Sequence, residues 1–478
     1  MKQTKAIALL VMLITSLTAN LFGEEAAAPA MRTNTWVRSS TSNALASNPD
    51  NWSLKHVPTE NEVVRLPASN PRSIIWDEAA PAVIGGWIQE NGYLAVATIA
   101  TSRDGAIKEL HIKGDFYVFD GGVTHHPNSD EDKWWLNLKV DGDMKTGERS
   151  FVSVSGKGFA SGKGPSPGLE PGYGASHGGQ GSTRIGADFI NNSLCYDSII
   201  NPTQSGSGGT TKEGGLYSYN GGGVIIIKIG GSLTHNGTIC ANADESDIDG
   251  TNYGGAAGGT VNLTINKHFY GNGKIQANGG RGWHNGAGGG GGGRIAIVYN
   301  KVCPGTEEGR DPSDYPTRQA VAYGGVGETN NPQNTNADKH VRAACGTVYI
   351  ENRFRTNIPG GGSVIIRDWQ RSTTASTRIP SDICDNPEEI KDAAIHVHED
   401  SFVTLTSSIN IRALVFYGPN GLDLNNNYIY TGLVKDDRLR KELRDFGTYD
   451  ISNYNDIFGC VIFNNGSITI QTYLKPIL

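Results

Sequence analysis

The chain repeats one glycine-led unit three times: Gly222-Gly-Val-Ile-Ile-Ile-Lys-Ile229, Gly258-Gly-Thr-Val-Asn-Leu-Thr-Ile265 and Gly292-Gly-Arg-Ile-Ala-Ile-Val-Tyr299. Corresponding glycines lie 36 residues apart, from Gly223 to Gly259, and then 34 apart, from Gly259 to Gly293. A nearly fixed period of this size is typical of a solenoid, in which each turn buries its apolar side against the next. The stretch therefore predicts a fold more directly than a function.

A shorter motif follows the first two units at the same interval. Gly237-Thr-Ile-Cys-Ala-Asn242 is matched by Gly273-Lys-Ile-Gln-Ala-Asn278, 36 residues later, so each turn holds two strands in register. Asparagine tolerates a left-handed backbone, and its side-chain amide can bond its stacked copy in the next turn. We expect Asn242 and Asn278 to form an architectural ladder that does not contact a substrate.

Alternation along the strands assigns side chains to two faces of each repeat. The alignment treats five glycines as equivalent: Gly223, Gly259, Gly293, Gly346 and Gly362. It places five apolar side chains inside: Ile225, Val261, Ile295, Val348 and Val364. Two outward rows result, one of Lys228, Thr264, Val298, Glu351 and Arg367 and another of Ile226, Asn262, Ala296, Tyr349 and Ile365.

The outward rows hold one carboxylate, that of Glu351. A glycoside hydrolase usually needs two carboxyl groups about 5 to 10 Å apart, and adjacent turns are about 4.8 Å apart, so a catalytic pair would show as stacked acids. This weakens the hydrolase hypothesis. Acids outside the alignment stay open as contributors, namely Asp141 with Asp143 and Glu399 with Asp400, although solvated turn residues are the simpler interpretation.

A polysaccharide lyase needs a base that removes a proton beside a carboxylate, and cations that neutralise that carboxylate. Glu351, Arg367 and Lys228 share an outward row and are the candidate catalytic residues for such an enzyme. Lys228 lies several turns from the other two in this alignment. Solvated charges on an exposed sheet are the simpler interpretation of all three.

The first residues have the pattern of an export signal. Lys2 and Lys5 precede an apolar core from Ala6 to Leu17, and small residues near Gly23 offer a cleavage point. No later run is apolar over the roughly 18 residues that a membrane-spanning helix needs. We expect residues 1–23 to be a signal peptide and the mature protein to be secreted, on the cell surface or in the periplasm, with no membrane span.

Charge and cysteine spacing argue against two classes of partner. The net charge of −7 and the pI near 5.9, with scattered basic residues, argue against nucleic acid. None of the six cysteines has metal-site spacing, so up to three disulfides or buried thiols are expected rather than zinc.

The entry into the repeats and their glycine-rich tracts resemble a known group. Asn34-Thr-Trp-Val and the stretch from Asp50 to Leu66, with its Asn-Trp and Val-Pro, resemble the start of exported bacterial β-solenoid proteins of the pectin-lyase-like shape. The glycine-rich insertions at about 156–215 and 283–293 resemble the coils of the same proteins and, less closely, those of some phage tail adhesins. The resemblance implies an all-β, right-handed parallel β-helix.

This fold divides the mature chain into three parts. Residues 31–110 are expected to form an N-terminal cap and the first coils, 111–430 the β-helix with its glycine-rich insertions, and 431–478 a C-terminal cap with the last strands. An amphipathic helix is expected from Lys435 to Phe446. The glycines of 286–293 permit close backbone approach in extended segments.

Four residues are candidates for carbohydrate binding: Trp134, Trp135, Trp283 and His284. A tryptophan ring can stack on a sugar, and a histidine can orient hydroxyls. Alternation puts Trp134 and Trp135 on opposite sides, so at most one of them is expected to be a platform, and core or cap packing is the alternative. Trp36, Trp52 and Trp76 are expected to cap the end of the core.

An acidic segment is the candidate calcium site. Glu245, Asp247 and Asp249 alternate before a glycine turn, which suits oxygen coordination of calcium. The loop is incomplete as an EF-hand because Ala256 stands where the closing glutamate belongs, and a hydrated insertion is the alternative. No cofactor is required by this interpretation.

The leading hypothesis for function is a secreted or surface-associated protein with a structural or glycan-binding, adhesin-like role, whose partner is a polysaccharide or cell-surface glycan. The alternative, a glycoside hydrolase or polysaccharide lyase acting on an extracellular polysaccharide, rests on the fold resemblance.

Overall fold

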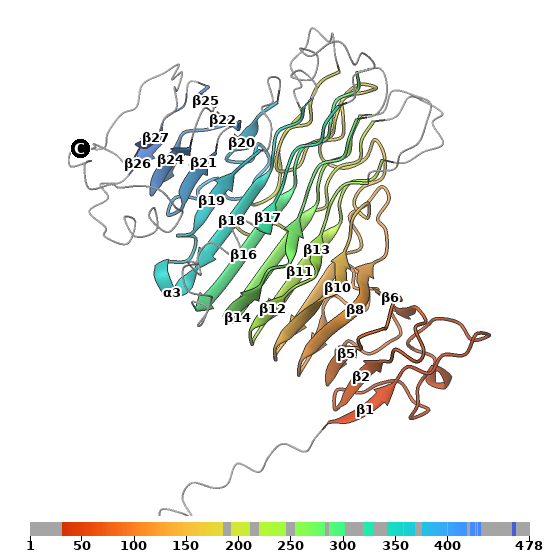
Figure 1. The fold of residues 1–478 in the computed structure, drawn as a ribbon. Helices are drawn as coiled ribbons and strands as arrows, with labels where there is room; N and C mark the ends of the chain where they lie inside the picture. The colour runs from red at the N-terminus through yellow and green to blue at the C-terminus, as the bar shows by residue number, and fades with distance from the viewer. Residues whose placement is uncertain are drawn as a thin grey trace, which may run out of the picture.

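The computed structural model describes residues 31–184, 193–210, 219–244, 254–282, 286–301, 319–327, 342–356, 358–368, 375–398, 400–417, 421–425, 427, 429–431 and 461–464. In these residues the protein is all-β apart from the short 3-10 turn η1 (Pro49–Asn51) and the four-residue helix α3 (Arg353–Thr356). The strands stack one beyond another from β1 at one end of an elongated array to the blue strands at the other (Figure 1). The all-β, parallel-strand part of the prediction is confirmed.

The strands up to residue 352 form three parallel ladders. The first contains β1 (Arg32–Thr35), β2 (Glu62–Leu66), β5 (Gly86–Gln89), the starts of β8 (Phe116–His125) and β10 (Met144–Ser153), β12 (Leu233–His235) and the end of β14 (Thr260–Gly271). The second contains β3 (Ile74–Trp76), β6 (Val96–Ile99), the ends of β8 and β10, β13 (Thr238–Cys240), β15 (Lys274–Gln276) and β17 (Ala320–Val321). The third contains β4 (Val83–Ile84), β7 (Leu110–Ile112), β9 (Leu136–Val140), β11 (Val224–Ile229), the start of β14, β16 (Arg294–Lys301) and β18 (Thr347–Asn352).

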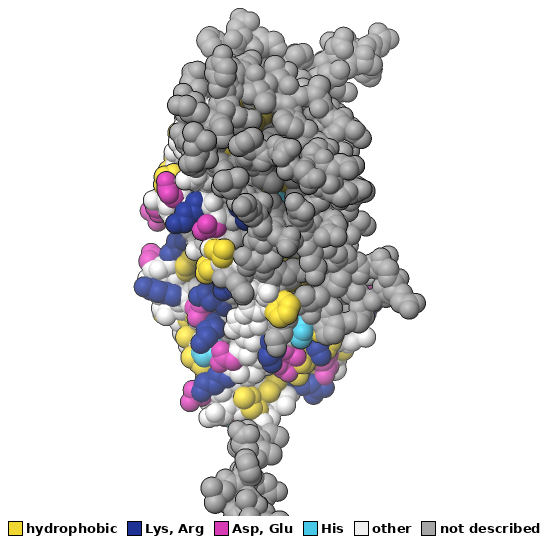
Figure 2. Space-filling model, turned by 90° about the vertical axis from the view of Figure 1, so that its left-hand side faces the viewer, with side chains coloured by type: hydrophobic (Ala, Val, Ile, Leu, Met, Phe, Trp, Pro, Cys, Tyr) yellow, Lys and Arg dark blue, Asp and Glu magenta, His cyan; other side chains and the backbone are white. Residues whose placement is uncertain are grey.

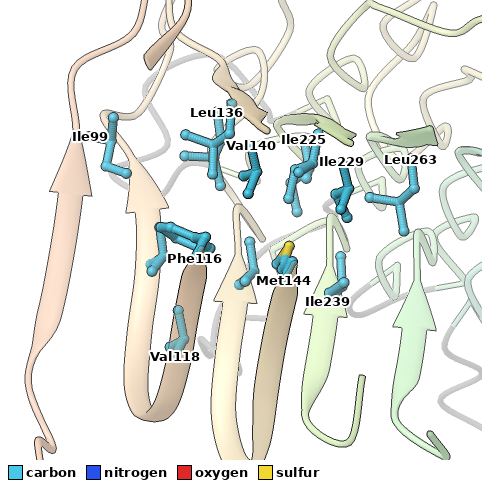
Figure 3. Close-up of a cluster of buried hydrophobic side chains, with 14 of the residues drawn as sticks. Ile99, Phe116, Val118, Leu136, Val140, Met144, Ile225, Ile229, Ile239 and Leu263 are labelled. Carbon is cyan, nitrogen blue, oxygen red and sulfur yellow. The ribbon is translucent and has the colours of Figure 1, made fainter. Parts of the chain in front are cut away.

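The register of the third ladder confirms the repeat. Ile225 pairs with Val261, 36 residues on, and Val261 with Ile295, 34 residues on. Ile295 then pairs with Val348, and all four side chains are buried in one apolar core. Side chains from all three ladders point into this core (Figure 3). Burying each such side chain is worth about 1.5–3 kcal/mol, so the stack is held mainly by this interior.

The asparagine ladder is present. Asn242 Oδ1 accepts a hydrogen bond from the backbone N–H of Asn278 at 2.8 Å, and Asn278 Oδ1 accepts one from the N–H of Tyr323 at 2.9 Å. Neither asparagine has a positive φ, so the side-chain bond rather than a left-handed backbone explains these positions.

Tryptophans fill the N-terminal end of the core. Trp36, Trp52, Trp76 and Trp87 form a chain of edge-to-face contacts with ring centroids 5.1, 6.2 and 5.6 Å apart. All four side chains are completely buried. The predicted capping role of the first three is confirmed, because no ring face is left for a sugar.

The alignment of Gly362 with the earlier glycines is wrong. β19 (Ser363–Ile366) pairs with β18 in the antiparallel sense, so Val348 faces Ile365 and Tyr349 faces Val364. Partners across a ladder point to the same side of the sheet. Ile365 therefore joins the core of the three ladders, whereas Val364 belongs to a second apolar core.

The strands beyond this junction form shorter parallel ladders around the second core. β19 continues the large sheet through β21 (Ala394–Val397), β24 (Ala413–Tyr417) and β27 (Val461–Asn464). Two small sheets accompany it, one of β20 (Thr377–Ile379), β22 (Phe402–Leu405) and β25 (Gly421–Asp423), the other of β23 (Ile409–Ile411) and β26 (Ile429–Thr431).

The described glycine-rich segments are not loose loops. Their backbones bond one another in succession: Gly222 N–H donates to Ala257 O, Gly258 N–H to Gly291 O and Gly292 N–H to Ala344 O, each at 3.0 Å. A Cβ on Gly290 would lie 1.9 Å from Ala256 O, so only glycine permits this approach. The expected close packing of 286–293 is present, and the insertion after β10 shares it.

Other expectations meet the structure only in part. The thiols of Cys195, Cys240, Cys345 and Cys384 are free, so disulfides do not form at these four positions, and the first three are the buried thiols expected as the alternative. Cys303, Cys460, the signal peptide at 1–23 and the helix expected at 435–446 lie outside the described residues. Among those described, no helix has the length and apolar character to cross a membrane.

Candidate functional site

An aromatic and cationic cluster lies where the chain enters β9. Trp134 is half-buried, its ring centroid is 4.9 Å from that of His126, and Lys133 Nζ is 4.7 Å from the ring. Asn128 fixes the backbone here: its Oδ1 accepts from Trp134 N–H at 2.6 Å, and its Nδ2 donates to Trp134 O at 2.9 Å. We call His126, Lys133, Trp134 and Lys157 the Trp134 cluster.

Burial and a neighbouring charge favour the neutral form of the histidine in the Trp134 cluster. Partial burial and then the positive charge of Lys157 lower the pKa of His126, against a smaller opposing effect of Glu78. Burial also lowers the pKa of Lys157. A neutral imidazole offers one donor and one acceptor, so His126 can bind a hydroxyl from either side. The cluster therefore combines an aromatic face with hydrogen-bonding groups.

Trp135 has a different environment. Its ring lies 4.5 Å from the Arg103 guanidinium, and its Nε1 donates to Lys108 O at 3.1 Å. Arg103 is itself held by Asp132 at 2.7 Å and by Thr203 O. An anchored cation thus occupies the face of Trp135. The same guanidinium joins the segment around Thr203 to the ladders. Lys133 lies at a similar distance from the Trp134 ring, but Arg103 is the cation that other partners fasten in place, so of the two adjacent tryptophans Trp134 is the better sugar platform.

Glu351 is held as a structural residue. Its side chain is buried and accepts from Tyr349 Oη at 2.8 Å and from Arg353 Nε at 3.0 Å. The N–H of Gly360 donates to the same carboxylate at 3.2 Å. The carboxylate therefore ties α3 and the turn before β19 to β18.

The structure does not bring Lys228 and Arg367 to Glu351. Lys228 pairs with Thr264, Thr264 with Val298 and Val298 with Glu351, so three strand spacings, about 14 Å, separate the two ends. Lys228 forms an exposed ion pair with Glu109 at 2.9 Å. Arg367 follows the antiparallel β19 and is outside this row.

Surface charges are mixed. On the face seen in Figure 2, cationic and anionic side chains are interspersed over the described part, without a field of one sign. Polar side-chain contacts join different turns of the stack, such as the ion pair of Lys113 with Glu60 at 2.6 Å and the contact of His111 with Asp141 at 2.7 Å. Such exposed pairs are worth at most about 1 kcal/mol each.

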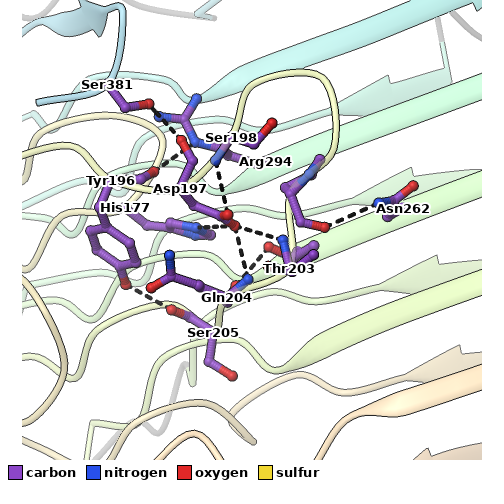
Figure 4. Close-up of polar contacts among 12 residues, drawn as sticks. His177, Tyr196, Asp197, Ser198, Thr203, Gln204, Ser205, Asn262, Arg294 and Ser381 are labelled. Carbon is purple, nitrogen blue, oxygen red and sulfur yellow. Dashed lines mark hydrogen bonds and ion pairs between the residues drawn. The ribbon is translucent and has the colours of Figure 1, made fainter. Parts of the chain in front are cut away.

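A buried polar centre lies against the outer face of the third ladder (Figure 4). Asp197 has a positive φ of 70°, and its carboxylate accepts from the N–H groups of Ser198, Thr203 and Gln204, each at 2.8 Å. His177 Nε2 lies 3.6 Å from the same carboxylate. Burial alone would raise the pKa of Asp197, but these partners outweigh it and the pKa is lowered.

Arg294 connects this centre to the rest of the molecule. Its guanidinium is fully buried and donates to Tyr196 O at 2.9 Å, Thr347 Oγ1 at 2.8 Å and Ser381 Oγ at 2.6 Å. Ser381 Oγ donates in turn to Asp197 O at 2.7 Å. Because the groups are sealed from solvent, we interpret the centre as a fastening between the insertion, β16 and β18, and the second core.

One residue of the repeat, Arg294, indicates this centre in the sequence. Arg294 occupies the row of Val224, Thr260 and Thr347, where the other repeats carry apolar or hydroxyl side chains. A cation in a buried row requires specific partners.

Trp283, His284, Glu245, Asp247 and Asp249 lie outside the described residues. Within the described part of the chain, no group of three or more His, Cys, Asp or Glu side chains is placed to hold a metal ion.

No protein-family model, no curated protein and no solved structure matches this chain.

Proposed function

We propose that the three parallel ladders are the faces of a right-handed β-helix, and that the protein is a secreted or surface-associated rod with a structural and glycan-binding, adhesin-like role. Consecutive pairing at intervals of 28, 36 and 34 residues supports the helical winding. The glycine-rich layers support a rigid scaffold, since their backbones are bonded to one another.

The observation that carries the binding role is the half-buried Trp134 ring beside the His126 imidazole. A sugar ring presents C–H groups to an aromatic face and hydroxyls around its edge, and the Trp134 cluster offers partners for both. The Lys133 and Lys157 ammonium groups add donors for hydroxyl or acidic groups of a glycan. Asn128 holds the backbone, so the platform is preorganised.

A panel of immobilised neutral and acidic polysaccharides tests the proposal. The mature protein should be retained by at least one glycan, and Trp134→Ala should weaken that binding about tenfold, equivalent to about 1.4 kcal/mol. Phe354→Ala is the matched control, because Phe354 is 66% exposed on α3, far along the chain from the cluster.

Two outcomes would contradict the proposal. Retention that is unchanged in Trp134→Ala would remove the cluster as the binding site. Release of reducing ends or unsaturated products from the retained glycan would replace the binding role with an enzymatic one.

A further inference from the structure

A second surface lies on the outer face of the first ladder, outside the Trp134 cluster. Tyr117 pairs with Lys145, Lys145 with Thr234 and Thr234 with Tyr270. All four side chains are half-buried. They point away from the core, because their neighbours along each strand are buried in it or belong to the adjoining turn, and successive side chains of a strand point to opposite faces. We call these four residues the Tyr117 row.

Each end of the Tyr117 row carries a pair of rings. The Tyr117 and Phe119 ring centroids are 5.7 Å apart, and Phe119 is 38% exposed. The Lys145 ammonium lies 4.8 Å from the centroid of the Tyr117 ring, so a sugar stacks on this platform by displacing a flexible lysine or by using the Phe119 ring. At the other end, the His268 and Tyr270 centroids are 5.4 Å apart. Three strand spacings separate the two ends, which is about 14 Å. The surface therefore has two aromatic platforms that a single monosaccharide cannot touch together.

Polar groups lie beside the first platform and toward the middle of the row. Asp115 Oδ1 accepts from Asp143 N–H at 2.8 Å, and Asp115 Oδ2 accepts from Tyr117 Oη at 2.6 Å. Asp143 Oδ1 accepts in turn from Ser232 N–H at 2.8 Å. These bonds fix both carboxylates along the edge of the row, where they can accept hydrogen bonds from hydroxyl groups.

The ladder itself restricts the kind of ligand. β8, β10 and β12 each have a strand paired on both sides, so an added peptide strand finds no free edge at Tyr117, Lys145 or Thr234. Recognition must use side chains. Asp115 and Asp143 are balanced by Lys145 and by the exposed Lys267 next to His268, so this surface has no net charge of either sign, which favours a neutral polymer over an acidic one.

We propose that the Tyr117 row binds a linear neutral polysaccharide that runs across the strands, along the direction in which they stack. The polymer places sugar rings on both aromatic platforms and its hydroxyls against Asp115, Asp143, Lys145 and Thr234. This inference rests on the proposed glycan-binding role and adds a second binding surface with a defined ligand class and direction.

The test compares neutral oligosaccharides of different length by calorimetry: cellohexaose, xylohexaose and mannohexaose against their disaccharides, with hexagalacturonate as the acidic probe. We expect at least one neutral hexasaccharide to bind more tightly than its disaccharide and than hexagalacturonate. Tyr117→Ala and Tyr270→Ala should each weaken the hexasaccharide five- to tenfold. Tyr117→Phe, which keeps the ring, should lose less than threefold.

Tyr323→Ala is the matched control, because Tyr323 is a half-buried tyrosine that follows the second ladder. Thermal unfolding of every variant separates loss of binding from loss of folding. Unchanged hexasaccharide binding in the Tyr117→Ala/Tyr270→Ala double variant would overturn the Tyr117 row, and a loss in Trp134→Ala in the same experiment would leave the proposed function standing. Equal or tighter binding of hexagalacturonate would overturn the neutral ligand class. Absence of binding to every oligosaccharide and to the polysaccharide panel would overturn both proposals.

Discussion

The regions before and after the β18–β19 junction use one continuous sheet in opposite ways. From β4 to β18 the third ladder turns Ile225, Val261 and Ile295 toward the first core. From β19 onward the same sheet turns Val364 and Ile395 toward the second core, which lies on its other face. The antiparallel pair is the point at which the buried face changes, while the hydrogen-bonded sheet runs through it.

This difference shows what limits a stacked-strand array. In a parallel repeat the apolar side chains stay on one face of the sheet as long as each strand keeps the same two-residue alternation in register. A single antiparallel pairing can shift that register by one residue and move the apolar side chains to the other face. The outer face near the junction is consequently covered: Ala296, Val298 and Tyr349 are outward residues of the third ladder, yet they are buried in the second core. Toward the N-terminal end the same outer face carries the exposed Lys228.

The largest effect is expected from emptying one core at a time. Ile295→Ala in the first core and Ile395→Ala in the second should each cost about 3–4 kcal/mol of unfolding free energy, as for other buried isoleucines. If the cores are separate cooperative units, hydrogen exchange should rise mainly in 225–299 for the first variant and in 363–417 for the second. Equal loss of protection in both regions from either substitution would show a single unit.

A smaller effect is expected from the link between the regions. Arg294→Met removes three hydrogen bonds from a buried cation and should cost about 2–3 kcal/mol. The loss should also separate the unfolding of the two regions, seen as a broader denaturant transition. Arg378→Met is the control, because Arg378 forms its ion pair with Asp382 within one region. A transition that stays equally sharp would show that Arg294 does not couple them.

The sequence predicted the part of the fold that follows a period. The glycine-led units fixed the register of β11, β14 and β16, because identical spacing brings Ile225, Val261 and Ile295 into one column. The reversal at β19 carries no such signal: Gly362 precedes a short apolar strand just as Gly346 does, and strand direction does not alter that pattern. The direction of β19 is therefore set by its pairing with β18 and not by its local sequence pattern.

The sites were less predictable than the fold. Trp134 and Trp135 were found as aromatic residues, but only the structure shows that Arg103 covers Trp135. The Tyr117 row was visible in principle, since Gly114-Asp-Phe and Gly142-Asp-Met recur 28 residues apart. This shorter interval precedes the large insertion and differs from the later 36 and 34, so an alignment built on the later repeats did not reach it.

Acid should weaken both regions through buried histidines. His235, in the first, donates from Nε2 to Lys274 O at 3.0 Å and bonds Thr146 Oγ1 through Nδ1 at 2.7 Å, and burial lowers its pKa to about 4. In the second, burial and then the charge of Arg412 lower the pKa of His396 to about 3. The unfolded chain, with histidine pKa values near 6.5, binds these protons first, so stability is lost as pH falls below about 6.5.

At pH 5 each of these two histidines should remove about 2 kcal/mol of the stability present at pH 7.5, because both folded-state pKa values lie below 5. Denaturant titrations at the two pH values measure the loss. His235→Gln should reduce the pH dependence of protection in 225–299, and His396→Gln that in 363–417, whereas His111→Gln, on the surface beside Asp141, should leave both as they are. If His235→Gln reduced the pH dependence of protection equally in both regions, the two cores would unfold as one cooperative unit, even though the β18–β19 junction separates them in the structure.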